Sequence, residues 1–250
     1  MPKAVLVERI ADVRRRIEAA ALRSARQPGS VRLVAVSKFR TVDEIREAVE
    51  AGIADIGESR IQEAEDKRRR LPEPGLTWHL VGRLQSNKAK KAVQIFDVIH
   101  SIDSLELARR VDGLAREQNK KQPVLIQVQL AEEESKQGLP VSELFADLER
   151  MTRLPGLEVW GLMALPPYLQ DPEEVRPFFR RLRELRDTAR ARGLVGPAFD
   201  QLSMGMSHDF EVAVEEGATL VRIGTALFGD RPASEPSWLG GAGAAGEDGR

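Results

Sequence analysis

The chain has 250 residues, no cysteine and a formal net charge of −1. The lack of cysteine excludes disulfides, thiolate nucleophiles and zinc ribbons, and the balanced charge gives no electrostatic reason to expect nucleic acid or an anionic membrane as the main partner. With 42% hydrophobic residues, a chain of this length can bury a large core as one domain.

The N-terminal stretch, "MPKAVLVERIADVRRRIEAA", carries charges between apolar residues at helical spacing. This pattern predicts an amphipathic helix, because a signal peptide or a membrane span needs an uninterrupted apolar run. We therefore expect a cytoplasmic protein.

Beyond this helix, short apolar runs alternate with amphipathic stretches. Residues 31–36 indicate a strand buried on both faces, and Thr41 and Gly52 suit the start and end of the helix that follows. Similar runs predict seven more strands, at residues 53–57, 77–82, 97–102, 123–130, 157–165, 198–205 and 219–224. The expected helices cover residues 41–52, 59–70, 86–96, 103–119, 141–154, 171–192 and 207–217.

About eight strands alternating with helices predict the α/β class and a (β/α)8 TIM barrel with an extra N-terminal helix. A doubly wound open sheet is the alternative, but no G-x-G-x-x-G follows the first strand. From Asp230 onward the sequence loses its periodicity and is rich in Gly, Ala and Pro. We predict one domain over residues 1–229 and a disordered tail over residues 230–250.

Polar residues gather where the predicted strands end, the positions that face the active-site mouth of such a barrel. The first, seventh and eighth strands supply cations, hydroxyl groups and glycines: Lys38, Ser203, Gly205, Ser207, Arg222, Gly224 and Thr225. Glycines let the backbone approach a ligand, and barrels often hold phosphate in the loops after strands seven and eight. The sequence therefore predicts a phosphate facing Lys38 across the barrel.

A lysine opposite a phosphate suggests pyridoxal 5′-phosphate (PLP) held as a lysine aldimine. Arg222 opposite the pyridine nitrogen would keep that nitrogen unprotonated, because a guanidinium only donates hydrogen bonds. An unprotonated ring is a weaker electron sink, so extensive carbanion chemistry such as transamination is not expected.

The segments "LVAVSKFRTVDEI", "WHLVGRLQSNKAKKAV" and "LSMGMSHDFEVAVEEGATLVRIGTALFG" resemble the pyridoxal phosphate homeostasis protein family, and the match runs from residue 31 to residue 229. The resemblance implies a monomeric barrel of the alanine-racemase type with PLP on Lys38 and no established catalytic activity. It places the ring nitrogen near Arg222 and the phosphate near Ser203, Met204, Gly205, Gly224 and Thr225.

The chain departs from the family pattern at two places. It reads Gly57, Glu58, Ser59, Arg60 where the family usually has G-E-N-Y, and Arg83 where the family usually has proline. Without the asparagine, Ser59 would have to replace one polar contact beside the cofactor ring.

Three functions stay open at this point. The first is a non-enzymatic carrier that buffers PLP in the cell and releases it to PLP-dependent apoenzymes. The second is an amino-acid racemase, which needs a second acid or base opposite the lysine; the only tyrosine is Tyr168, with His79 and His100 as the other candidates. The third is a ligand-modulated interaction protein. We favour the carrier.

Other polar residues have simpler interpretations. His79, His100 and His208 lack the spacing of metal ligands, and we expect the first two to be hydrogen-bonded mouth or core residues. The basic stretches "DKRRR" (residues 66–70) and "NKAKK" (residues 87–91) are typical of solvated helix faces, because no aromatic residue that could stack on bases lies among them.

Overall fold

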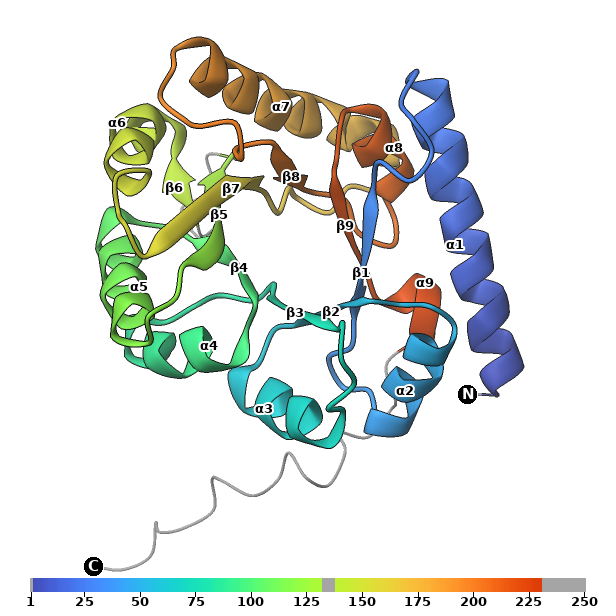
Figure 1. The fold of residues 1–250 in the computed structure, drawn as a ribbon. Coiled ribbons are helices and arrows are strands. Elements are labelled where there is room, and N and C mark those ends of the chain that lie inside the picture. Colours follow the sequence, from blue (N-terminus) through green and yellow to red (C-terminus); the bar gives the residue numbers. More distant parts are fainter. Residues whose placement is uncertain (1, 132–137, 231–250) are drawn as a thin grey trace, which may run out of the picture.

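The computed structural model describes residues 2–131 and 138–230, and these residues form a closed parallel barrel surrounded by helices (Figure 1). Its strands are β1 (Arg32–Val36), β2 (Asp55–Glu58), β3 (Thr77–Leu80), β4 (Val98–Ile102), β5 (Gln122–Gln129), β7 (Leu157–Met163), β8 (Gln201–Ser203) and β9 (Leu220–Ile223). β9 pairs in parallel with β1, and β4 pairs with β5, so the sheet has no open end. The predicted (β/α)8 barrel is confirmed, and the open sheet is wrong.

Helices follow the strands as the periodicity predicts. They are α2 (Val42–Glu50), α3 (Ile61–Arg70), α4 (Ala89–Ile95), α5 (Leu105–Glu117), α6 (Val141–Met151), α7 (Arg176–Ala191) and α8 (Phe210–Glu215). The 3-10 turns η1 (Ser86–Lys88) and η2 (Pro172–Val175) lie at the starts of the helices predicted over residues 86–96 and 171–192, but their 3-10 type was not predicted. Two further short elements were not predicted: the two-residue strand β6 (Leu139–Pro140) and the four-residue helix α9 (Thr225–Phe228). Elements this short leave too little pattern to detect.

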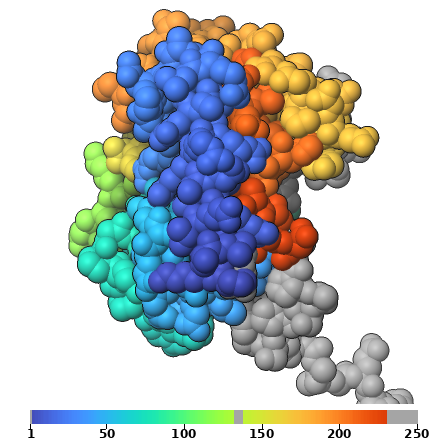
Figure 2. Space-filling view, turned by 90° about the vertical axis from the view of Figure 1, so that its right-hand side faces the viewer, coloured from blue at the N-terminus to red at the C-terminus, as the bar shows by residue number. Residues whose placement is uncertain are grey.

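The extra N-terminal helix, α1 (Lys3–Arg23), is confirmed and lies along the outside of the barrel (Figure 2). Leu6, Ile10, Val13 and Ile17 are buried at spacings of four, three and four residues, which form one stripe of a helix. The stripe packs against α2, α8 and α9. No described helix is long and apolar enough to cross a membrane.

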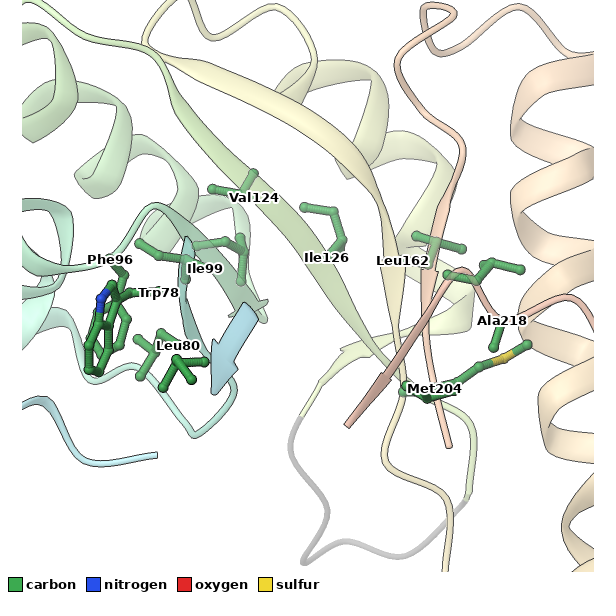
Figure 3. Close-up of a cluster of buried hydrophobic side chains, with 14 of the residues drawn as sticks. Trp78, Leu80, Phe96, Ile99, Val124, Ile126, Leu162, Met204 and Ala218 are labelled. Atoms are coloured by element: carbon green, nitrogen blue, oxygen red, sulfur yellow. The ribbon is translucent and has the colours of Figure 1, made fainter. Parts of the chain in front are cut away.

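The alternation of side chains along each strand builds two apolar layers. One layer lies between the strands and the surrounding helices and contains Trp78, Phe96 and Ile99 (Figure 3). A smaller apolar cluster, to which strands β1, β4, β5, β7 and β9 each contribute one residue, lies inside the barrel: Val34, Val98, Leu125, Met163 and Leu220. The barrel is therefore a packed core, and a ligand has room only at its ends.

The start of α2 sets the direction of the chain after β1. The Thr41 hydroxyl accepts a hydrogen bond from the Glu44 N–H at 3.2 Å, and the Glu44 carboxylate accepts one from the Thr41 N–H at 2.8 Å. This capping box confirms the predicted N-cap. The helix expected from residue 207, in contrast, begins only at Phe210. The predicted tail beyond Asp230 lies outside the described residues, so the domain boundary stays a prediction.

Candidate functional site

A cavity of about 640 Å³ opens at the carboxyl ends of the strands. Five of the residues predicted for the site line it: Lys38, Ser207, Arg222, Gly224 and Thr225. Its remaining lining residues are Val36, Arg40, Ser59, Val81, Gly82, Leu165, Tyr168, Met206, His208 and Asp209. The cavity therefore combines an apolar wall with cations and hydroxyl groups.

The other three predicted site residues lie behind this wall. Ser203 and Met204 are fully buried, and Met204 belongs to the layer between strands and helices. Gly205 has φ +90°, and a Cβ there would lie 2.6 Å from the Ala213 Cβ, so this position requires glycine. These residues shape the cavity through their neighbours.

Lys38 lies half-buried in a tight turn between β1 and α2. The Arg40 N–H donates to the Ser37 carbonyl at 3.0 Å across this turn, and Phe39 has φ +64°. A left-handed conformation is uncommon for a bulky residue, so the surrounding structure must hold the turn.

A buried ion cluster of Glu58, Glu63 and Lys67 holds both sides of the turn. The Lys67 ammonium donates to the Ser37 carbonyl, to Glu58 Oε1 and to Glu63 Oε1, each at 2.6 Å. Glu63 Oε1 also accepts the Phe39 N–H at 2.8 Å. Because these bonds flank Lys38 on its two sides, the cluster positions the lysine.

Lys67 corrects one prediction made from the sequence. It belongs to the basic stretch that we interpreted as a solvated face, yet its exposed fraction is only 2%. The burial of an ammonium requires compensating charges, which Glu58 and Glu63 supply. The pair at positions 63 and 67 has the i,i+4 spacing of a helical ion pair, a signal that could have located the cluster.

Two carboxylates share one ammonium in this cluster, and both are buried. Burial, together with the nearby Glu63 carboxylate, raises the pKa of Glu58 to about 7 although Lys67 opposes the shift. The second oxygens of Glu58 and Glu63 have no hydrogen-bond partner among the described residues. The ionised form of Glu58 is therefore costly, and the neutral form is favoured by folding.

The raised pKa of Glu58 predicts a specific pH dependence of stability. Between the carboxyl group's ordinary pKa of 4.5 and about 7, the folded state binds more protons than the unfolded state, so the contribution of Glu58 to the unfolding free energy falls as pH rises. Glu58→Gln cannot ionise. We expect its unfolding free energy, relative to the unmodified protein, to be higher at about pH 8 than at about pH 5. Urea denaturation at both pH values measures this difference, and a pH-independent difference would contradict the assignment.

Arg222 supplies the second cation of the cavity from β9. Its guanidinium donates to the Ser203 hydroxyl at 2.6 Å and to the Ala164 carbonyl at 2.9 Å. Burial lowers the pKa of Arg222 to about 10, while the Asp209 carboxylate opposes the shift. The group thus stays charged at neutral pH and presents donors only.

Ser207 and Thr225 bring hydroxyl groups to the same cavity. The Ser207 hydroxyl accepts from the N–H groups of Gly224 and Ala226, both at 3.2 Å, and so joins the loop after β8 to the start of α9. It does not cap α8, whose N-cap residue is Asp209. Thr225 is exposed at the rim.

The candidate proton-transfer groups occupy different environments. The side chain of Tyr168 is 75% exposed, and its ring lies 4.9 Å from the ring of His208 at the cavity rim. His79 and His100 are fully buried and lie outside the cavity lining. We predicted that these two histidines are hydrogen-bonded mouth or core residues, and they are core residues: His79 bonds to Asp55 at 2.8 Å and to His100 at 2.9 Å.

The departures from the expected family pattern have visible structural consequences. Ser59 lines the cavity, and a Cβ on Gly82 would lie 2.5 Å from the Ser59 carbonyl oxygen, so the two loops approach closely there. The Arg60 guanidinium lies 4.8 Å from the centroid of the Phe39 ring and covers the turn that carries Lys38. Arg83 is exposed.

Comparison with known proteins shows the family of this chain. The model of the alanine racemase N-terminal domain matches residues 11–232. A pyridoxal phosphate homeostasis protein of Aquifex aeolicus is 46% identical over 224 residues, which cover 90% of this chain and 97% of that protein.

Solved structures agree with this match. PipY of Synechococcus elongatus, determined with PLP bound, is 39% identical and superposes with a TM-score of 0.80 over 90% of this chain and 100% of PipY. An alanine racemase of Clostridium difficile is 13% identical, with a TM-score of 0.67 over 93% of this chain and 57% of the racemase. The racemase shares the fold.

Proposed function

Given that this chain belongs to the pyridoxal phosphate homeostasis protein family, whose barrel is that of the alanine racemase N-terminal domain, we propose that it binds PLP on Lys38 and takes part in PLP homeostasis as a monomeric, non-enzymatic carrier. The observation that carries the proposal is one cavity in which Lys38 and Arg222 lie together with the hydroxyl groups of Ser207 and Thr225.

The cavity fits this cofactor in size and chemistry. A volume of about 640 Å³ lies within the usual range for small-molecule sites. The hydroxyl groups and the nearby cations suit a phosphate, and Val36, Val81 and Met206 offer an apolar wall to an aromatic ring. When bound, PLP supplies an aldehyde that condenses with a lysine amine.

Each cation would have a separate task. The amine of Lys38 would form the aldimine, and the cluster beneath the turn would keep that amine pointed into the cavity. Arg222 would donate a hydrogen bond to the ring nitrogen and leave it unprotonated. These roles would bind the cofactor but leave its ring a weak electron sink, so they do not favour carbanion chemistry.

The alternative, a racemase, requires a second proton-transfer group on the opposite face of the substrate. The burial of His79 and His100 argues against both histidines in this role. Tyr168 and His208 line the cavity rim and are the candidates that the described residues offer. The exposed position of Tyr168 leaves this side of the cavity open to water, which weakens electrostatic catalysis and favours exchange of the cofactor.

The two functions separate in one experiment. PLP-loaded protein is incubated with the apo form of a PLP-dependent enzyme, and the return of that enzyme's activity is followed. We expect transfer of PLP and negligible racemisation of common amino acids. A racemisation rate of about 1 per second or faster would lie within the usual range of enzymes. If this activity disappeared in Tyr168→Phe or His208→Gln, the protein would be a racemase and the carrier function would be refuted.

Thr225→Ala tests the phosphate end of the proposed site. If the Thr225 hydroxyl donates one hydrogen bond to the phosphate, its removal should weaken PLP binding by roughly 0.5–1.5 kcal/mol. Thr225→Ser is the matched control, because it retains the hydroxyl group, and its affinity should stay close to that of the unmodified protein. Fluorescence titration with PLP gives both affinities. Equal affinity of Thr225→Ala and the unmodified protein would show that the Thr225 hydroxyl does not bind the phosphate.

A further inference from the structure

A chain of buried polar side chains runs through the inside of the barrel from Arg222 to Asp55. The Arg222 guanidinium donates to the Ser203 hydroxyl at 2.6 Å, and this hydroxyl lies 2.8 Å from His100 Nδ1. His100 Nε2 lies 2.9 Å from His79 Nδ1, and His79 Nε2 lies 2.8 Å from Asp55 Oδ1. Each of the four ring nitrogens thus has a partner at hydrogen-bond distance.

The two ends of this chain determine its direction. At one end, Arg222 can only donate, so the Ser203 oxygen accepts from it. At the other end, Asp55 is paired with Arg32. Burial opposes ionisation there, yet the hydrogen bonds from His79 and Arg32 keep the pKa of Asp55 below its ordinary value. An ionised carboxylate only accepts, so His79 must carry its proton on Nε2.

The proton positions of the side chains between Arg222 and Asp55 follow from these two ends. A neutral His79 with a proton on Nε2 presents Nδ1 as an acceptor, so His100 donates from its own Nε2. A neutral His100 in turn presents Nδ1 as an acceptor, so the Ser203 hydroxyl donates its proton to it. Burial lowers the pKa of both histidines, which favours the neutral rings that this order requires.

We propose that Ser203, His100, His79 and Asp55 form a one-way hydrogen-bond chain that positions Arg222 at the cavity. All donors point from Arg222 toward Asp55, and both histidines are neutral Nε2–H tautomers. The Ser203 oxygen is thereby held as an acceptor for the guanidinium. With the Ala164 carbonyl as the second acceptor, Arg222 has one fixed orientation and its other N–H groups are left to the cavity.

This role rests on the proposed function, because the group that Arg222 would face is the cofactor ring. The chain itself can be tested without cofactor. The sequence contains only three histidines, so long-range ¹H–¹⁵N spectra of the cofactor-free protein can be assigned to His79, His100 and the surface residue His208. We expect Nε2–H tautomers at His79 and His100 that are neutral at about pH 7. An Nδ1–H tautomer or an imidazolium at either residue would overturn the proposal.

A double-mutant cycle tests the effect on Arg222. Ser203→Ala removes the acceptor and should weaken PLP binding about 3- to 10-fold, the equivalent of one hydrogen bond. In an Arg222→Met background the same substitution should change PLP affinity by less than about 2-fold, because no guanidinium is left to position. Equal losses in the two backgrounds would show that Ser203 acts independently of Arg222.

Ser101→Ala is the matched control for the loss of a buried hydroxyl group. Ser101 is 1% exposed, and its hydroxyl has no hydrogen-bond partner among residues 2–131 and 138–230. We expect Ser101→Ala to bind PLP as the unmodified protein does, and a loss equal to that of Ser203→Ala would overturn the proposal. If the unmodified protein itself failed to bind PLP, the proposed function would fail while the histidine spectra still tested the chain.

Discussion

Lys38→Ala is expected to lose all borohydride-stable attachment of PLP. In the unmodified protein, reduction followed by peptide mapping should place the label on the peptide that contains Lys38. The reason is geometric: among the described residues, Lys38 is the lysine that lines the cavity, together with Arg222 from the neighbouring strand β9. Arg222 and the hydroxyl groups of Ser207 and Thr225 remain in Lys38→Ala, so this variant should still bind PLP without the covalent bond.

Lys90→Ala serves as the control for this labelling. Lys90 lies on the exposed face of α4, outside the cavity lining, and its loss should leave both the label and the absorption of the bound cofactor unchanged. A label on the peptides of Lys88 or Lys90, or a label that persists in Lys38→Ala, would refute the role given to Lys38.

Of the substitutions proposed for this protein, Lys67→Met should cause the largest decrease in the free energy of unfolding. The substitution keeps most of the side-chain volume but removes the ammonium from between Glu58 and Glu63, which are buried to 98% or more of their surface. Breaking a buried ion pair costs about 3–5 kcal/mol, because a charge is left without compensation. Since the unpaired carboxylates then favour protonation, the loss should be smaller at about pH 5 than at about pH 8.

Urea denaturation measures this loss, and Lys91→Met provides its control. Lys91 pairs with Glu65, and both side chains are 47% exposed. An exposed pair contributes at most about 1 kcal/mol, because water screens it. A loss from Lys67→Met that is no larger than the loss from Lys91→Met would show that the buried cluster does not stabilise the fold. PLP affinity should fall in Lys67→Met but not in Lys91→Met, because Lys67, unlike Lys91, bonds to the turn that carries Lys38.

The sequence alone determined the barrel, the N-terminal helix and the position of Lys38. These features depend on local information. The alternation of apolar runs with amphipathic stretches distinguishes strands from helices, and the end of a strand is visible where a buried run gives way to polar residues. The cap at Thr41 is likewise readable, because its partner Glu44 lies three residues away.

The tertiary structure alone decided which polar residues are buried and which partners they meet. Lys67 lies in a basic stretch that is typical of a solvated helix face. It is a buried charge because Ser37 and Glu58, which come from two neighbouring strands, bond to its ammonium. Ser203 was predicted at the mouth. It pairs with Leu220 of β9, however, which lies two residues before Arg222 and so farther from the carboxyl end of that strand. The physical reason is that periodicity shows which side chains share a face, whereas the burial of a polar group depends on partners that approach from distant parts of the chain.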